Sequence, residues 1–159
     1  MSLKIALDAG HGMSTAGKRC KKSIDPNESR EWYLNDRIAD RLEKRLENFE
    51  CKVLRVGDTT GKKDISLTTR VNSANNWNAD VYISIHHNAG VNGGSGGGVM
   101  VFYCSSKTER PKQAKALYDE LVRYTGLKGN RSTPVKNYPY TVVKKTKMPA
   151  FLIENGFMD

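Results

Sequence analysis

The sequence alternates short, almost wholly apolar runs with longer segments whose apolar residues recur at helical spacing. Strands of a parallel sheet read as continuous apolar runs because helices cover both faces of the sheet. The alternation therefore predicts a three-layer α/β fold, with a mostly parallel, twisted sheet of about six strands flanked by helices. We expect strands at residues 3–9, 53–56, 81–85, 99–103, 140–143 and 150–153, and helices at about 26–48, 66–77 and 110–124.

The length of 159 residues suits one domain, and shares of 38% apolar and 27% charged residues are typical of globular proteins. No apolar segment is long enough to cross a bilayer, and the N-terminus lacks the pattern of a signal peptide. We therefore expect synthesis in the cytoplasm without a signal peptide. Cys20, Cys51 and Cys104 are widely spaced and odd in number, which favours free thiols.

The net charge of +9 predicts attraction to anionic surfaces such as nucleic acid, wall polymers or acidic membranes. The basic residues are dispersed along the chain, however, and no aromatic-basic RNA-binding motif accompanies them. We therefore expect no nucleic-acid partner, and we treat anionic wall polymers as secondary ligands. The charge modifies the function of this chain and does not define it.

The start of the first helix carries an unusual carboxylate. Asp25 as the cap, Pro26 at the first helical position and Glu28 at the third predict a capping box that keeps Glu28 at the surface. The buried stripe of this helix, followed backward from its end, reaches Glu31; it is formed by Phe49, Leu46, Leu42, Ile38 and Asn35. A charge on the core-facing side must find a strong partner, so Glu31 is a candidate functional residue.

Three further candidates follow strands of the expected sheet. His11 comes after the first strand, His86 ends the third, and Glu154 ends the last. Ligands of parallel α/β sheets bind beyond the carboxyl ends of the strands, where the connecting loops converge. We therefore expect these side chains to meet at one edge of the sheet, where the loop over residues 12–25 also brings Glu31.

Two imidazoles and one carboxylate are a common ligand set for catalytic zinc, which activates a water and polarises a carbonyl. We predict one zinc ion bound by His11, Glu31 and His86. Glu154 is then the carboxylate that takes a proton from the water and passes it to a leaving amine. Adjacent residues of a strand point to opposite faces, so only one of His86 and His87 can face the site easily.

Each of these residues, taken alone, also has a structural interpretation. A histidine at the end of a strand is more often structural than a metal ligand. Glu31 alone would more often form a salt bridge at a helix end. Asn88 has the alternative of shaping the turn after the third strand. The case for a site rests on the combination.

Four segments, taken together, resemble the motifs of one family in the expected order. The family is the N-acetylmuramoyl-L-alanine amidases of the amidase-3 type, found in bacteria and in phage endolysins. The segments are LDAGHG at 7–12, Glu31 with Asn35 and Ile38-Ala39, SIHHNA at 84–89, and PAFLIENGF at 149–157. Leu67, Arg70, Ala74 and Asn75 match a further helix pattern of the family, which we interpret as structural.

This resemblance covers nearly the whole chain and implies a zinc enzyme with the α/β amidase fold. The implied reaction cleaves the amide between the lactyl group of N-acetylmuramic acid and L-alanine of the peptidoglycan stem peptide. The implied roles are metal binding for His11, Glu31 and His86, catalysis for Glu154 and substrate binding for Asn88. His87 departs from the small residue that is usual there. Family members also continue beyond the position of Asp159, so we expect a single catalytic domain, residues 1–159, without a final helix or wall-binding domain.

Two other functions, nucleotide binding and non-catalytic adhesion, are alternatives for this sequence. Gly12 to Lys18 spells G-x-x-x-x-G-K after a strand, but Arg19 stands where a phosphate loop needs Ser or Thr, and residues 20–26 are a poor helix start. A non-catalytic basic module that binds wall polymers or nucleic acid would bind in a salt-sensitive way, but it leaves the histidines and Glu31 without a purpose. We therefore expect a monomeric amidase that acts on peptidoglycan after release, as an endolysin or an enzyme of autolysis or sporulation.

Overall fold

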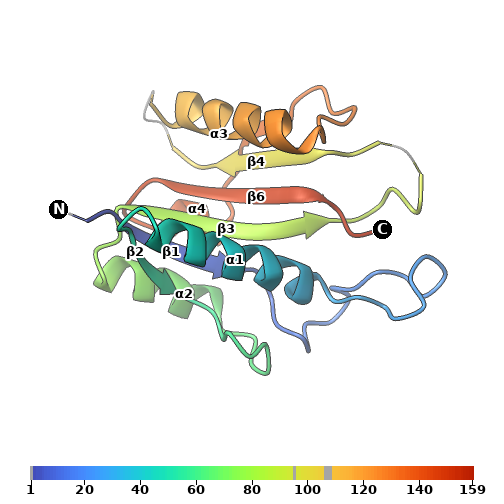
Figure 1. Cartoon of the computed structure of the whole chain (residues 1–159), viewed down its shortest axis with the longest axis horizontal. Helices are drawn as coiled ribbons and strands as arrows, with labels where there is room; N and C mark the ends of the chain where they lie inside the picture. The colour runs from blue at the N-terminus through green and yellow to red at the C-terminus, as the bar shows by residue number, and fades with distance from the viewer. Residues whose placement is uncertain (1, 95, 106–108) are drawn as a thin grey trace.

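The computed structural model describes residues 2–94, 96–105 and 109–159, and its strands form one sheet in the order β2-β1-β3-β6-β4-β5 (Figure 1). The strands are β1 (Lys4–Ala9), β2 (Lys52–Arg55), β3 (Val81–Asn88), β4 (Val99–Tyr103), β5 (Val135–Asn137) and β6 (Ala150–Phe157). All neighbouring strands run parallel except β4 and β6, which are antiparallel. The predicted six-stranded, mostly parallel sheet is confirmed, and β6 lies between β3 and β4.

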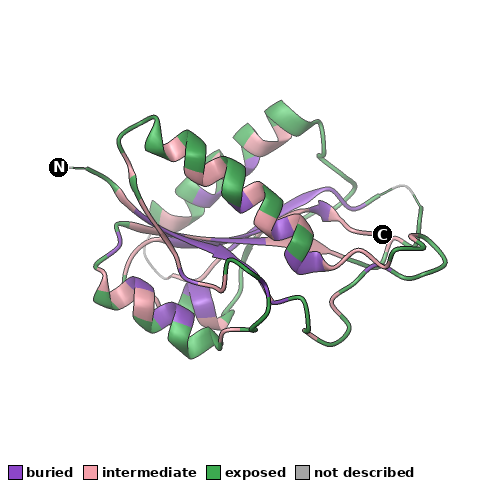
Figure 2. Cartoon of the chain, turned by 60° about the horizontal axis from the view of Figure 1, so that its bottom comes forward, coloured by how far each residue is buried: buried purple, intermediate pink, exposed green. Residues whose placement is uncertain are grey.

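Helices cover both faces of this sheet, as the three-layer prediction requires (Figure 1). The helices are α1 (Glu31–Glu47), α2 (Leu67–Asn76), α3 (Glu109–Thr125) and α4 (Thr141–Lys145). On one face, α1 and α3 pack against side chains such as Ile85 and Ile153. On the other face, α2 and α4 pack against side chains such as Tyr82 and Leu152. Figure 2 shows the buried residues gathered in the sheet and on the inward sides of the helices.

The first helix begins five residues later than the capping-box pattern predicts. Arg30, not Asp25, is its cap, and Glu31 is its first residue. The Asp25 carboxylate instead accepts hydrogen bonds from the backbone N–H groups of Asn27 and Ser29, both at 2.9 Å, and so closes a turn. Glu28 has a φ of 47° and forms an ion pair with an arginine side chain rather than a capping box.

The physical reason is a pairing between segments that are distant in sequence. The N–H of Cys20 donates to the carbonyl of Ser29 at 2.9 Å, and the N–H of Glu31 donates to the carbonyl of Lys18 at 3.0 Å. An isolated antiparallel bridge joins the two residues between them, Arg19 and Arg30. Local capping signals over 25–28 are therefore overridden, and the backbone cannot become helical before residue 31.

The predicted buried stripe of α1 is confirmed at its N-terminal end, where Glu31 lies, and is wrong at its C-terminal end. Glu31 and Asn35 are buried, and Ile38 and Leu42 pack against the core. Phe49 is 71% exposed, so its place in the predicted stripe was wrong. The helix ends at Glu47, and Phe49 belongs to the turn that follows, where helical spacing no longer applies.

Residues 141–143 belong to the short helix α4, with Tyr140 as its cap, so the strand expected over 140–143 was wrong. Val142 and Val143 are buried in α4, and the fifth strand is the short β5, which pairs with β4. An apolar run of four residues does not distinguish a strand from a short helix, so periodicity alone was insufficient. The helices expected at 66–77 and 110–124 are confirmed as α2 and α3 to within one residue at each end.

Two sequence expectations concern the chain as a whole. Cys20, Cys51 and Cys104 are free thiols, as predicted. Within the described residues, no helix combines the length and the apolar character that a bilayer crossing requires.

Candidate metal centre

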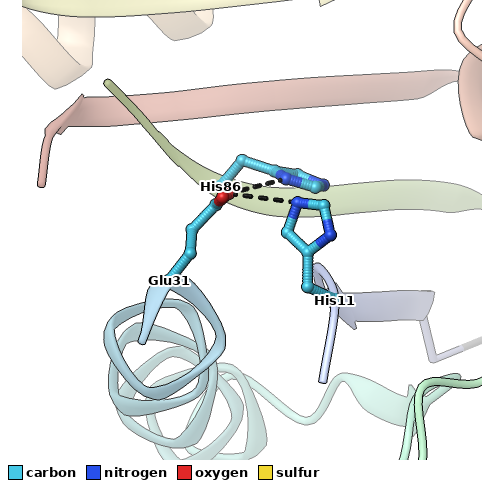
Figure 3. A group of neighbouring side chains, drawn as sticks. All are labelled: His11, Glu31 and His86. Atoms are coloured by element: carbon cyan, nitrogen blue, oxygen red, sulfur yellow. Dashed lines mark hydrogen bonds and ion pairs between the residues drawn. The ribbon is translucent and has the colours of Figure 1, made fainter. Parts of the chain in front are cut away.

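Three predicted ligands meet at the carboxyl edge of the sheet (Figure 3). His11 lies just beyond β1, His86 lies near the end of β3, and Glu31 opens α1. Oε1 of Glu31 is 3.1 Å from Nδ1 of His86 and 3.3 Å from Nε2 of His11. One ligand-type atom from each of the three residues lies within 4.8 Å of the others. The structure therefore brings together donors that are distant in sequence.

The spacing of these donors tests whether the site fits a metal. Ligand atoms about 2.0–2.1 Å from a tetrahedral zinc ion lie roughly 3.3 Å from one another. The observed separations of 3.1 and 3.3 Å from the Glu31 oxygen to the two imidazole nitrogens are close to that value. Two imidazoles and a carboxylate also match zinc in chemical type. The residues present therefore fit the ion.

Glu31 is held as an anion although its side chain is only 2% exposed. Burial alone would raise the pKa of this carboxyl, but hydrogen bonds and charge interactions with His11 and His86 lower it well below its ordinary value. The ammonium group of Lys18 lies 3.7 Å from the other oxygen, and the N–H of His87 donates to Oε1 at 3.3 Å. A buried carboxylate surrounded by donors is prepared to bind a cation.

Gly10 makes room for one of the two histidines. A Cβ atom at this position would overlap the imidazole ring of His86, so a larger residue would displace the ring from the site. The next residue, His11, has a φ of 69°, a left-handed conformation that turns the chain sharply after β1. The ring of His11 thereby meets the ring of His86 edge-on, with centroids 4.9 Å apart.

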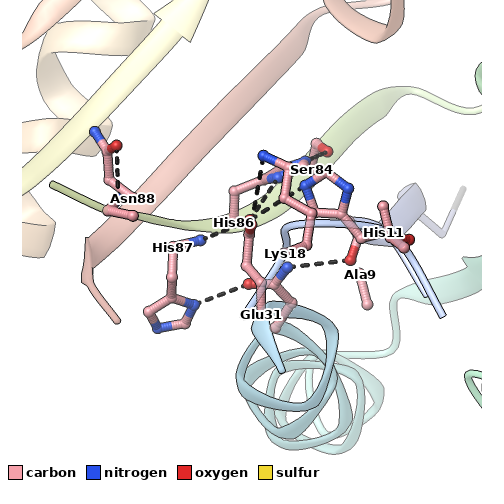
Figure 4. Close-up of polar contacts among 12 residues, drawn as sticks. Ala9, His11, Lys18, Glu31, Ser84, His86, His87 and Asn88 are labelled. Carbon is pink, nitrogen blue, oxygen red and sulfur yellow. Dashed lines mark hydrogen bonds and ion pairs between the residues drawn. The ribbon is translucent and has the colours of Figure 1, made fainter. Parts of the chain in front are cut away.

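His86 and His87 point to opposite sides of β3, as the alternation of strand residues predicts (Figure 4). The ring of His87 faces α1, where its Nδ1 lies 2.8 Å from the side-chain oxygen of Asn35. Burial there lowers the pKa of His87. His87 thus contributes its backbone N–H to Glu31, while its ring lies outside the group of three.

Glu154 occupies the neighbouring strand, with its Cα paired to that of His86. Its Oε2 atom is buried without a hydrogen-bond partner in the part of the chain that the structure describes. Burial raises the pKa of Glu154 to about 7, because the charge interaction with His86 offsets only part of the desolvation. A carboxyl with a pKa near neutral can both accept and release a proton at physiological pH.

His11, His86 and Glu154 line a cleft of about 640 Å³. The wall near Glu154 is formed by Tyr138 and Tyr140, whose rings are 4.5 Å apart and whose outer faces are half-exposed. Phe102 packs edge-on against both tyrosines. Lys18 also lines the cleft. The sequence reasoning missed both tyrosines because they lie in an irregular connection, and it treated Lys18 only as part of an incomplete phosphate-loop pattern. No helix follows that pattern until Glu31.

Asn88 lies outside both the group of three candidate ligands and the residues that line the cleft. Its side-chain oxygen accepts a hydrogen bond from the N–H of Ala89 at 2.8 Å, and its amide nitrogen faces the sulfur of Met100 at 3.9 Å. Asn155, which the sequence reasoning did not select, donates to the carbonyl of His86 at 3.2 Å and so supports the strand at the site. The motif over 149–157 contained the signal for Asn155.

Both the sequence and the fold of this chain are similar to those of known proteins. The family model described as "N-acetylmuramoyl-L-alanine amidase" (Amidase_3) matches residues 5–159. The chain is 32% identical over 157 residues to the N-acetylmuramoyl-L-alanine amidase CwlM of Bacillus licheniformis, covering 99% of this chain and 57% of CwlM. It is also 32% identical to the sporulation-specific N-acetylmuramoyl-L-alanine amidase of Bacillus subtilis, again covering 99% of this chain and 57% of the relative.

Among solved structures, that of the N-acetylmuramoyl-L-alanine amidase from Clostridium difficile 630 is similar with a TM-score of 0.79. The two chains are 30% identical, and the match covers 96% of this chain and 78% of the other. This chain thus spans a little more than half the length of the curated relatives named above. Because the family model matches nearly all of its residues, the chain belongs to the amidase-3 family of N-acetylmuramoyl-L-alanine amidases.

Proposed function

We propose that this chain hydrolyses the amide bond between the lactyl group of N-acetylmuramic acid and L-alanine of the peptidoglycan stem peptide. The observation that carries the proposal is the meeting of His11, Glu31 and His86 beside Glu154, whose buried Oε2 has no hydrogen-bond partner among the described residues. A metal-ligand set next to a proton carrier is the arrangement that amide hydrolysis needs. A purely adhesive basic module would have no use for it.

We propose one zinc ion per chain, bound by Glu31 and the two imidazoles. When bound, zinc supplies Lewis acidity toward the amide carbonyl and lowers the pKa of a water. Glu31 serves this role because it remains an anion in a buried position. Lys18, close to the second oxygen of Glu31, limits the negative charge that accumulates in the cleft.

Glu154 performs the proton transfers in this proposal. In its ionised form it takes a proton from the attacking water, and in its protonated form it delivers that proton to the departing nitrogen of L-alanine. The leaving nitrogen must therefore lie beside Glu154. The stem peptide then extends past Glu154 toward Tyr140 and Tyr138, which form that wall of the cleft. Burial and the nearby Glu154 carboxylate raise the pKa of Tyr140, which keeps the phenol neutral there.

We further propose that residues 1–159 act as one catalytic unit and as a monomer on the cell wall. All four chemical groups come from a single chain, so no second copy is needed to complete the site. The net charge of +9 favours contact with anionic wall polymers alongside peptidoglycan. Substrate binding by Asn88 would require it to act from outside the cleft, so we assign it to shaping the end of β3.

Mass spectrometry of digested peptidoglycan tests the proposed bond. Purified cell walls are incubated with the protein, with the protein after chelator treatment, and with the chelated protein after zinc is restored. We expect intact stem peptides with a free L-alanine amine, lost on chelation and restored by zinc. Products cut within the glycan or within the peptide would refute the assigned bond. Salt-sensitive wall binding without any products would favour the adhesive module instead.

A further inference from the structure

A buried chain of hydrogen bonds runs from His86 away from the metal centre. Nδ1 of His86 faces Glu31, while Nε2 lies 3.1 Å from the hydroxyl of Ser84. The same hydroxyl donates to Oδ2 of Asp8 at 2.8 Å. Ser84 and Asp8 are both at most 1% exposed, so water does not compete for these contacts. The chain thus connects the candidate ligand to a buried anion.

The buried carboxylate of Asp8 has a fixed position. The guanidinium of Arg70 forms an ion pair with Oδ1 of Asp8 and also donates to the carbonyls of Ala9 and His11, each at 2.8 Å. In this ion pair, Asp8 is a carboxylate, which can only accept hydrogen bonds. The same guanidinium holds the backbone of His11 in its left-handed conformation. One buried ion pair therefore supports the backbone of one candidate ligand and the side-chain contacts of another.

The direction of each hydrogen bond follows from this arrangement. Because Asp8 can only accept hydrogen bonds, the hydroxyl of Ser84 must donate its single hydrogen to Asp8. The oxygen of Ser84 is then left to accept, so Nε2 of His86 must carry the hydrogen of their shared contact. A proton held on Nε2 leaves the lone pair of Nδ1 free when the imidazole is neutral. That nitrogen is the one that faces Glu31.

We propose that Ser84 and Asp8 are positioning residues of the metal centre, which hold the proton on Nε2 of His86 and so present Nδ1 to the zinc ion. The inference rests on the proposed zinc site. Both residues act through the tautomer and orientation of the ring and touch neither substrate nor metal. Hydrogen bonds of this kind behind a metal-binding histidine raise its affinity for the ion.

Tyr82 offers a matched control for the test. Its hydroxyl donates to the same Oδ2 atom of Asp8 at 2.9 Å, and its side chain is as fully buried as that of Ser84. Tyr82→Phe and Ser84→Ala each remove one hydrogen bond to Asp8. Only Ser84→Ala interrupts the connection to His86. A difference between the two variants therefore reports on the histidine and not on Asp8 itself.

Zinc affinity, measured by competition with a chromophoric chelator, distinguishes the two variants. Ser84→Ala is expected to weaken zinc binding about 10- to 100-fold, as is typical for loss of such a bond, and Tyr82→Phe less than about threefold. The metal-free proteins should show similar losses of melting temperature. Equal zinc affinities in the two variants would overturn the proposal. Absence of zinc binding in the unaltered protein would instead count against the metal site itself.

The tautomer can also be observed without any substitution. Long-range proton–nitrogen NMR spectra of the unaltered protein, recorded with zinc bound, report which imidazole nitrogen carries hydrogen. We expect the hydrogen of His86 on Nε2 and the metal-induced shift on Nδ1. Zinc on Nε2 would overturn the proposal even if Ser84→Ala failed to fold.

Discussion

Glu31 and Glu154 are carboxylates that both lie beside His86, yet their surroundings differ in almost every respect. Glu31 is surrounded by polar groups: two imidazoles, the backbone N–H of His87 and the ammonium of Lys18. Glu154 has a buried oxygen without a hydrogen-bond partner among the described residues. The pKa of Glu31 is accordingly lowered, and that of Glu154 is raised to about 7.

The difference shows how one residue type can take two chemical roles within one site. A carboxyl that stays ionised at all ordinary pH values is suited to hold a cation. A carboxyl that titrates near neutrality is suited to carry protons. Pairs of acidic groups whose environments move their pKa values apart are typical of acid–base catalysis. Four predictions test this contrast, in order of decreasing expected effect.

The largest effect is expected for Glu154→Gln. The amide preserves the shape of the side chain but cannot carry the proton, so the rate of hydrolysis should fall about 10²- to 10⁴-fold. Zinc content, measured by atomic emission, should stay at one ion per chain in our proposal. Loss of the metal in this variant would make Glu154 a ligand and remove the contrast with Glu31.

Glu31→Gln should act on the metal and not only on the rate. Removing the anionic ligand should reduce zinc affinity by more than the roughly 10- to 100-fold typical for loss of an outer hydrogen bond. The matched control is Glu28→Gln, which alters only a half-exposed ion pair with Arg19, worth about 0–1 kcal/mol. Zinc loss in the Glu28 variant with retention in the Glu31 variant would contradict the site. Competition with a chelator measures both.

The stability of the metal-free protein should depend on pH through Glu154. Its pKa is raised from 4.5 to about 7 in the folded protein, so the folded state favours the protonated form. The resulting stability is present below pH 4.5 and is lost as pH rises through 7. Relative to Glu154→Gln, the unaltered protein should lose about 1–3 kcal/mol of unfolding free energy between pH 4.5 and 8. Denaturant titrations at several pH values measure this loss, and a constant difference between the two proteins would contradict the raised pKa.

Tyr140→Ala should give the smallest effect, because it removes part of a wall and no reacting group. We expect KM for muramoyl-peptide substrates to rise a few-fold, within about 1 kcal/mol, with kcat little changed. Tyr33→Ala is the matched control, since Tyr33 is also a half-exposed tyrosine but lies on α1 outside the cleft. The rise in KM caused by Tyr140→Ala should become smaller when the stem peptide of the substrate is shortened. An unchanged rise would show that the peptide does not run along this wall.

Much of the site could be predicted from the sequence because it follows from the sheet. His11, His86 and Glu154 come directly after or at the ends of apolar runs, and parallel strands bring their carboxyl ends together. The choice of Glu31 over Glu28 rested on helical spacing, which the structure supports, and on a capping box at Glu28, which the structure does not form. These inferences use local patterns and one general rule about sheets.

The features that the sequence analysis predicted wrongly or missed depend on contacts between residues distant in sequence. The helix start at 25–28 satisfied every local rule but lost to the pairing of residues 18–20 with 29–31. The tyrosine wall and the position of Lys18 depend on the paths of irregular connections, for which sequence periodicity carries no information. The support of His86 by Ser84 and Asp8 needed the three-dimensional register of β1 and β3.

The place of β6 has a consequence for how the protein is made. Although this strand is the last in the sequence, it inserts between β3 and β4, at the middle of the sheet. Until residues 150–157 have left the ribosome during synthesis, β3 and β4 each have one unpaired edge. The strand that closes the sheet also delivers Glu154. In our proposal, a nascent chain without residues 150–157 also lacks the carboxyl of Glu154, so hydrolysis would require this strand to be in place.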